Sequence, residues 1–344
     1  MHLDPGSQKR RRRGRGETLE DREIPACVDT RGVVADSHLA NATSGTPVAR
    51  SNAYARGMTT TATTDELATL RSTIQDALLD LATVPDDALE RPWDWGDRGE
   101  IELRYGFFHP IEDLESTAAE IDRLGDTRSR ARVIVTPAVV AAWDLLGLLT
   151  GLTHADLDAD PGGGEWTIRL ALAHLIASQR SYALYTNWWR QQRLPGGTRQ
   201  LPEPPDDLDG SEPEDSYADG SLEDVRARIL ATIDEAARQT ADIDDEELGL
   251  IGRWSEKPVT IAFRQGRWSP HIAEHTVQVD KTLVMLGRQP TEVDRLVRRV
   301  GVAWGRVERS LWPEPANDAA LELASTAAAR TAATAASVKA TASR

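Results

Sequence analysis

The chain has 344 residues and a formal net charge of −15, with 40% hydrophobic and 28% charged residues. This length suffices for one large domain or two modest ones with a real core. The acidic balance argues against a nucleic-acid surface over most of the chain, and the single cysteine, Cys27, excludes an intrachain disulfide and a cysteine-based metal site. No apolar run of about 18 residues is present, so no membrane span is expected.

The two ends of the chain differ in composition from the middle. Residues 1–57 begin with the basic run QKRRRRGRG and lack hydrophobic periodicity, so we expect a disordered extension; a nucleic-acid or membrane-surface arm is the alternative. Met58 resembles a natural start, which leaves open whether the preceding residues are translated. Residues 313–344 are rich in Ala and Thr, and we expect a largely disordered tail that is helical only in its first part.

Hydrophobic spacing predicts helices at residues 63–84, 100–124, 136–152, 165–194, 221–243, 267–287 and 290–311. Pro110 predicts a kink or break in the second of these, whereas Pro137 marks a helix start. Ser221 and Asp224 form a capping-box pattern. The long apolar helix at 165–194 is expected to be central to the fold.

Two other segments interrupt the helical pattern. Residues 195–220 form a Pro/Gly/Asp-rich loop that is long enough to cover a site or to be mobile. Residues 258–268 are the one convincing strand-like piece and suggest half of a short hairpin.

An internal repeat is suggested by GEIELRYGFFHPI at 99–111 and GEWTIRLALAHLI at 164–176, which share spaced Gly-Glu, Arg and His positions at an offset of 65 residues. This similarity indicates a duplicated helical pair, with chance likeness between two helices as the alternative.

The candidate chemistry lies in four histidines on predicted helices. His271 and His275 are four residues apart, so both imidazoles project from one helix face and can bind one ion. His174 lies among apolar residues of the long helix, where its ring needs a partner, and is the candidate third ligand. His109 is the rival third ligand. The alternative is that these are ordinary helix residues.

The residues around the histidine pair exclude one class of metal enzyme and suggest a role for a neighbouring polar side chain. A zincin protease needs Glu directly after the first His, and Ile272 occupies that position. Gln278 shares the face of His271 and His275, so we predict that it polarises a bound water or contacts substrate, with a surface polar role as the alternative.

GGGEWTIRLALAHLIASQRSY and HIAEHTVQVDKTLVMLG resemble two helix segments of the DinB/YfiT-like superfamily. The resemblance covers about residues 130–312 and implies an all-α, up-down four-helix bundle with a long crossover. It implies divalent-metal ligands at His174, His271 and His275. Members include thiol-dependent S-transferases and a mycothiol-dependent maleylpyruvate isomerase, which act with low-molecular-weight thiols.

We therefore expect four regions: an extension at 1–57, a helical pair at 58–129 that is possibly a duplicated half-unit, a DinB-like bundle at 130–312 with a short hairpin-like insert, and a tail at 313–344. The expected function is that of a metal-dependent transferase or hydrolase that uses a small thiol or water against an electrophilic small molecule. Zn or Ni suits the imidazole ligands. The alternative is a non-enzymatic binding or stress-related module with a structural or vestigial metal site.

Further expectations concern the surroundings of the site and the state of the protein. Candidate pocket-lining or packing residues are Trp166, Trp188, Trp189 and Trp268, and candidate polar contacts or surface ion pairs come from Arg169 and Arg180. We expect a cytoplasmic homodimer with a small-molecule substrate, without nucleic acid or membrane as partner.

Overall fold

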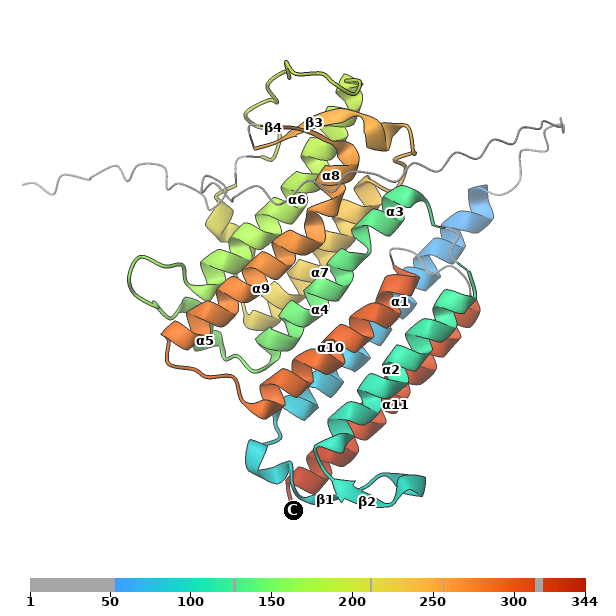
Figure 1. Ribbon diagram of the computed structural model, residues 1–344, viewed down its shortest axis with the longest axis vertical. Coiled ribbons are helices and arrows are strands. Elements are labelled where there is room, and N and C mark those ends of the chain that lie inside the picture. Colours follow the sequence, from blue (N-terminus) through green and yellow to red (C-terminus); the bar gives the residue numbers. More distant parts are fainter. Residues whose placement is uncertain (1–52, 126–127, 211, 256, 313–317) are drawn as a thin grey trace, which may run out of the picture. The chain divides into compact units, whose positions relative to one another are not determined.

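The computed structural model describes residues 53–125, 128–210, 212–255, 257–312 and 318–344, and most of them are helical (Figure 1). The helices are α1 (Ala53–Ala82), α2 (Tyr105–Arg123), α3 (Arg130–Val135), α4 (Pro137–Thr150), α5 (His154–Asp158), α6 (Ile168–Gln192), α7 (Leu222–Gln239), α8 (Ile261–Gly266), α9 (Trp268–Met285), α10 (Glu292–Leu311) and α11 (Asp318–Ala342). The prediction of an all-α fold is confirmed.

Two short antiparallel hairpins accompany the helices. Strand β1 (Pro92–Asp94) pairs with β2 (Glu100–Glu102), and β3 (Ile251–Trp254) pairs with β4 (Lys257–Thr260). The predicted hairpin-like insert is therefore present, but its strand ends at Thr260 and the rest of the 258–268 segment is helical. The other hairpin includes residues 100–102, which had been assigned to a helix.

Helices α4, α6, α7 and α9 form one four-helix bundle, here called the central bundle. In it, α4 and α6 each pack against both α7 and α9 (Figure 1). Capping confirms several predicted starts: Pro137 opens α4, and Ser221 and Asp224 form the capping box of α7.

Helices α1, α2, α10 and α11 form a second four-helix group, here called the terminal bundle because its members come from both ends of the described chain. Helices α1 and α2 each pack against both α10 and α11. In Figure 1 this group lies beside the central bundle, with α10 next to α4.

The C-terminal segment corrects a prediction. Residues 318–342 form the continuous helix α11, although a largely disordered tail was expected over 313–344. The physical reason is that small residues repeat on one face of α11, which packs against α1 and α2. The buried residues of this face are Ala320, Ala324, Ala327, Ala328, Thr331, Thr334, Ala335 and Val338. Residues 1–52 of the expected extension lie outside the described residues, whereas residues 53–57 belong to α1.

Of the two outcomes expected at Pro110, a kink or a break, the break does not occur. The helix runs from Tyr105 to Arg123 with Pro110 inside it. Pro110 lies near the helix start, where its missing N–H removes only one early backbone hydrogen bond, and its ring is buried.

One segment, which covers α3 and α4, is unusually apolar for its length. Residues 130–150 are long and apolar enough to cross a membrane by composition, with a mean hydropathy of 1.9, but 67% of the window is buried inside the fold. That burial is typical of a core helix.

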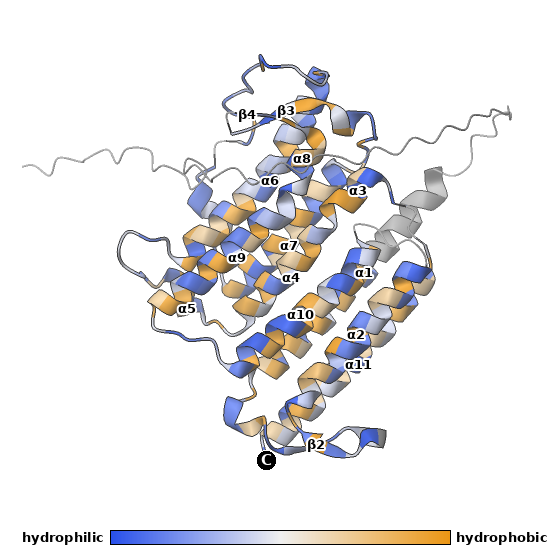
Figure 2. Cartoon of the chain, viewed as in Figure 1, coloured by the Kyte–Doolittle hydropathy of each residue, from blue (hydrophilic) through white to orange (hydrophobic). Residues whose placement is uncertain are grey.

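Hydrophilic residues alternate with hydrophobic ones along the outer helices, as Figure 2 shows for α10 and α2.

Helices α4 and α10 approach closely where they cross, and glycine makes this possible. A Cβ atom at Gly301 would lie 2.8 Å from the carbonyl oxygen of Trp143, and one at Gly305 would lie 2.9 Å from the Cα atom of Val140. On the α4 side, a Cβ atom at Gly147 would lie 2.8 Å from the Cα atom of Arg298. The contact between the two bundles is therefore a backbone-to-backbone one.

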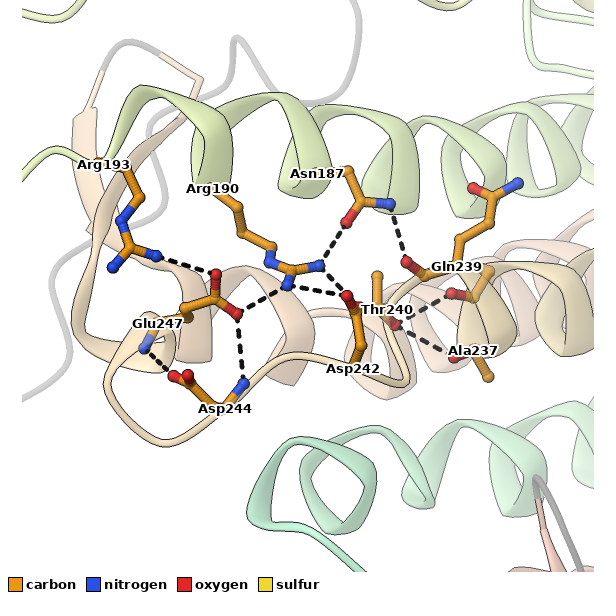
Figure 3. Close-up of polar contacts among 10 residues, drawn as sticks. Asn187, Arg190, Arg193, Ala237, Gln239, Thr240, Asp242, Asp244 and Glu247 are labelled. Carbon is orange, nitrogen blue, oxygen red and sulfur yellow. Dashed lines mark hydrogen bonds and ion pairs between the residues drawn. The ribbon is translucent and has the colours of Figure 1, made fainter. Parts of the chain in front are cut away.

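Polar contacts tie the end of α6 to the segment that follows α7 (Figure 3). Arg190 contacts Asp242 at 2.9 Å and Glu247 at 2.7 Å, and Asn187 donates to the carbonyl oxygen of Gln239. This network fixes one end of α6 relative to α7 and to the β3–β4 hairpin beyond it.

A buried charge network joins the two bundles. Glu308 of α10 is fully buried and accepts hydrogen bonds from the indole N–H groups of Trp143 (2.8 Å) and Trp304 (3.0 Å). Arg71 of α1 contacts Glu308 at 2.5 Å and Asp234 of α7 at 2.5 Å. Burial opposes the charge of Arg71, but the adjacent carboxylates raise its pKa.

We predict that Glu308→Ala lowers the free energy of unfolding by about 3–5 kcal/mol, because it leaves two buried indole donors without their acceptor and the buried Arg71 guanidinium with only one of its two carboxylate partners. Urea denaturation monitored by circular dichroism measures the change. Glu235→Ala is the control, since its ion pair with Arg238 is exposed and is expected to contribute less than about 1 kcal/mol. Equal effects of the two substitutions would contradict the assigned role of Glu308.

We also predict that Gly301→Ala lowers the free energy of unfolding by about 1–3 kcal/mol, because the added methyl group forces α4 and α10 apart. Gly249→Ala is the matched control, since a Cβ atom there meets nothing within 4 Å. The same denaturation measurement applies, and a neutral Gly301→Ala would show that the helix crossing tolerates extra volume.

Candidate metal centre

The three predicted histidines come together between two helices of the central bundle. His174 lies in the first half of α6, which is capped by the Thr167 hydroxyl accepting from the Leu170 N–H. His271 and His275 lie one helical turn apart near the start of α9. Because α6 packs against α9, all three rings face a common point.

The distances within the cluster are short. One nitrogen from each ring lies within 4.8 Å of the others, and His275 Nε2 is 3.2 Å from His271 Nε2. The ring centre of His174 is 5.0 Å from that of His275 and 5.6 Å from that of His271. Two nitrogens on a tetrahedral ion at Zn–N distances of about 2.0–2.1 Å would be about 3.3 Å apart, so the α9 pair already has ligand spacing.

The α9 histidines are held neutral. Burial, followed by the neighbouring His275, lowers the pKa of His271 to about 2. Burial and the nearby His174 lower the pKa of His275 to about 4. Neutral imidazole is the form that binds metals, so these two rings are ready ligands at neutral pH.

Outer partners orient two of the rings. His174 Nδ1 lies 2.5 Å from Glu214 Oε1, and His275 Nδ1 lies 2.8 Å from Gln278 Oε1. Each contact turns the Nε2 atom of its ring toward the cluster, which is the arrangement that metal-binding histidines adopt. The hydrogen bond from His174 lowers the pKa of Glu214, which keeps it a carboxylate. Among the described residues, the buried Nδ1 atom of His271 has no hydrogen-bond partner.

Gln278 therefore has a defined position. Its contact with His275 gives it an orienting role, and its predicted action on water or substrate stays a prediction.

The segment at 195–220 supplies Glu214 and lies against α6. Glu214 begins the 3-10 helix Glu214–Ala218, which packs on α6. Arg180 donates to the carbonyl oxygen of Asp209 and to the hydroxyl of Tyr217, and Arg169 donates to the carbonyl oxygen of Ala218. Both arginines thus anchor this segment, and Arg169 also forms an ion pair with Asp158.

Aromatic rings flank the cluster. Trp166 lies 5.3 Å from His174 between ring centres, and Tyr182 packs edge-on against His271 at 5.5 Å. Trp268 is fully buried in the main core one turn before His271. Trp188 and Trp189 belong to a separate small cluster with Ile243, Leu248, Leu250 and Ile261, so they pack the far end of α6.

His109 does not join the cluster. It lies on α2 in the terminal bundle, where its Nδ1 atom is 3.2 Å from the Thr334 hydroxyl of α11 and its ring packs on Trp93 and Trp95. The structure therefore brings together His174, and not His109, with the α9 pair.

Residues 140–279 match the family model of the DinB superfamily. This segment is DinB-like. It contains α6 and the three clustered histidines and extends over the central bundle from within α4 to within α9. No curated protein and no solved structure matches the chain.

Glu214 was missed by sequence reasoning. It is one of several acidic residues in a Pro/Asp-rich loop, 40 positions after His174, and no periodic pattern links the two. Pro213 and Glu214 begin a short helical turn. This local pattern does not by itself indicate that Glu214 lies next to His174, because that contact depends on how the loop packs on α6.

Proposed function

We propose that the chain binds one divalent metal ion through His174, His271 and His275. The carrying observation is a cluster of three imidazoles, two of them held neutral by burial, with outer oxygen partners on His174 and His275. Zn or Ni is the proposed ion, because three nitrogen donors without a carboxylate in the cluster suit these borderline metals better than Mg or Ca.

We propose further that the site is catalytic, as a transferase or hydrolase that uses a low-molecular-weight thiol or water against an electrophilic small molecule. Three protein ligands leave a coordination position open, and a bound ion lowers the pKa of a thiol or water there. Glu214 orients His174 and, with its side chain 54% exposed, is placed to accept a proton from an incoming thiol. Trp166 offers an apolar surface beside His174 for the substrate.

The alternative is a non-enzymatic binding module with a structural metal. The deep burial of His271 and His275, at 2% and 5% exposure, favours it, because structural sites are closed to solvent. Under either function we propose a cytoplasmic protein that forms a homodimer, has a small-molecule ligand and does not bind nucleic acid or membrane.

His174→Ala is predicted to reduce bound metal from about one equivalent to a small fraction, because two imidazoles on one helix bind an ion far more weakly than three ligands. Plasma emission spectroscopy of purified protein after loading and desalting gives the metal content. His109→Ala and His154→Ala remove one histidine each outside the cluster and should retain the full content. Full metal content in His174→Ala would refute the proposed site.

The same variant separates the two candidate functions. A catalytic site predicts that metal-loaded wild type accelerates thioether formation between a small thiol and 1-chloro-2,4-dinitrobenzene, with loss of the rate in His174→Ala and little change in melting temperature. A structural site predicts no rate in either protein and a large fall in melting temperature on chelation.

Glu214→Gln is predicted to weaken metal affinity by about 10–100-fold, because the neutral amide no longer enforces the Nδ1–H tautomer of His174. Competition with a chromogenic chelator measures the affinity. The control is Glu212→Gln. It removes an equal charge from an exposed side chain that lies two residues before Glu214. A similar loss in both variants would show that only net charge near the site matters.

A further inference from the structure

The terminal bundle repeats the topology of the central bundle. In each, a first and a second helix both pack against a third and a fourth helix: α4 and α6 against α7 and α9, and α1 and α2 against α10 and α11. The third helices, α7 and α10, also begin alike, each with a capping box closed by Asp at its third position. The central bundle lies between the two halves of the terminal one along the chain.

The second helices match residue by residue in what they bury. The offset of 65 residues that relates the two sequence motifs carries every buried residue of α2 onto a buried residue of α6. The buried residues of α2 are Gly106, Phe107, Pro110, Leu114, Thr117, Ala118 and Ile121; their counterparts are Ala171, Leu172, Leu175, Gln179, Tyr182, Ala183 and Thr186. The agreement extends over the whole of α2, at an offset that the two sequence motifs set independently of burial.

The first helices follow the same rule. The fourth helices follow it except at Ala328, whose counterpart Ser269 is half-buried, and at Arg330, which is exposed where His271 is buried. At an offset of 68, buried residues of α1 such as Leu70, Ile74 and Leu78 correspond to buried Ala138, Ala142 and Leu146 of α4. At an offset of 59, the buried residues Ala327, Thr331, Thr334, Ala335 and Val338 of α11 correspond to buried Trp268, Ile272, His275, Thr276 and Val279 of α9.

These offsets place a counterpart of the histidine cluster in the terminal bundle. His109 corresponds to His174, Thr334 to His275 and Arg330 to His271. The contacts agree: His109 touches Thr334 at 3.2 Å, as His174 faces His275, and each of the two histidines packs on a tryptophan at 5.3 Å, Trp95 in one bundle and Trp166 in the other.

A cavity and several charged side chains lie next to this counterpart of the histidine cluster. A cavity of about 430 Å³ lies beside His109, lined by Trp95, Arg98, His109, Glu112 and Asp113. Arg330 points to this region through a bidentate contact with Asp113, at 2.7 and 2.8 Å. One imidazole, a hydroxyl and a guanidinium do not make a metal site, since a guanidinium repels a cation.

We propose that the terminal bundle is an internal copy of the central bundle, and that the contact between His109 and Thr334 marks the counterpart of the histidine cluster, in which Thr334 and Arg330 take the place of two histidines. The terminal bundle of the wild-type chain is therefore expected to bind no metal ion. Only the choice of ligand, a divalent transition metal, rests on the function proposed for the central bundle.

The test restores the missing ligands. The double substitution Arg330→His and Thr334→His should add a second equivalent of Zn²⁺ per chain, and adding His109→Ala to it should remove that equivalent. Metal content by plasma emission spectroscopy and Zn²⁺ titration by calorimetry provide the readout. Loss of the Arg330–Asp113 pair is tolerable because both side chains are partly exposed, at 50% and 23%.

The matched control places the same two histidines out of phase. Ala329→His with Ala333→His keeps the spacing of four residues on exposed positions of α11, so it should give no equivalent that depends on His109. The proposal is overturned if a folded double variant gains no second equivalent, or if the gained one survives His109→Ala.

A milder variant keeps the test decisive if the double variant unfolds. Arg330→His with Thr334→Cys removes the guanidinium, enlarges position 334 less than histidine does, and places a thiol at the 3.2 Å contact with His109. Co²⁺ should then give a thiolate charge-transfer band above the wild-type baseline, which already includes Cys27. Absence of the band, or its persistence after His109→Ala, would also overturn the proposal.

The outcome is distinguishable from that of the proposed function. Metal at the central bundle depends on His174, whereas metal at the restored site depends on His109. If the wild-type chain binds no metal but the double variant binds one equivalent through His109, the proposed function fails and the internal-copy inference stands.

Discussion

The fold depends on keeping one fully buried carboxylate satisfied. Glu308 has no exposed surface and accepts from Trp143, Trp304 and Arg71, which lie on α4, α10 and α1. An ionised group in such a place is tolerated only when its lone pairs are matched by well-placed donors. The donors come from both bundles, and Arg71 extends the network to Asp234 on α7. A shift of any of these helices by one turn would leave a buried charge without partners, so the network selects one register for the contact between the bundles.

The candidate metal centre uses that fixed frame. Helix α4, which supplies Trp143 to the network, packs against α9, which supplies two of the three histidines. On the other side, Arg190 holds the end of α6 (Figure 3). The anchored segment that carries Glu214 holds α6 along its length. Three imidazoles can stay mutually close only if such surroundings prevent them from turning to water. The cluster is therefore a property of the packed helices rather than of the H-x3-H spacing alone.

Helix positions, the capping box of α7 and the three clustered histidines followed from the sequence, because periodicity and short-range capping are local. The apolar setting of His174 and the family resemblance favoured it over His109, and the structure separates the two by bundle. The helix at 318–342 could not be predicted, since Ala and Thr give a weak apolar pattern that becomes a core face only against α1 and α2. Glu214 depends on loop packing across 40 residues, which no local pattern encodes.

The duplicated architecture explains why a bundle without metal ligands persists. In the central bundle, α9 carries bulky side chains such as Trp268 and His275 at its buried positions. At the corresponding positions α11 carries Ala327 and Thr334, so α1 and α2 can close on it without a bound ion between them. The terminal bundle retains its part of the contact between the two bundles. Arg71 and Glu308 belong to this bundle, and its Gly301 and Gly305 lie where α10 crosses α4. Thr334 and Arg330, at the positions that correspond to His275 and His271, contribute to neither the charge network nor that crossing.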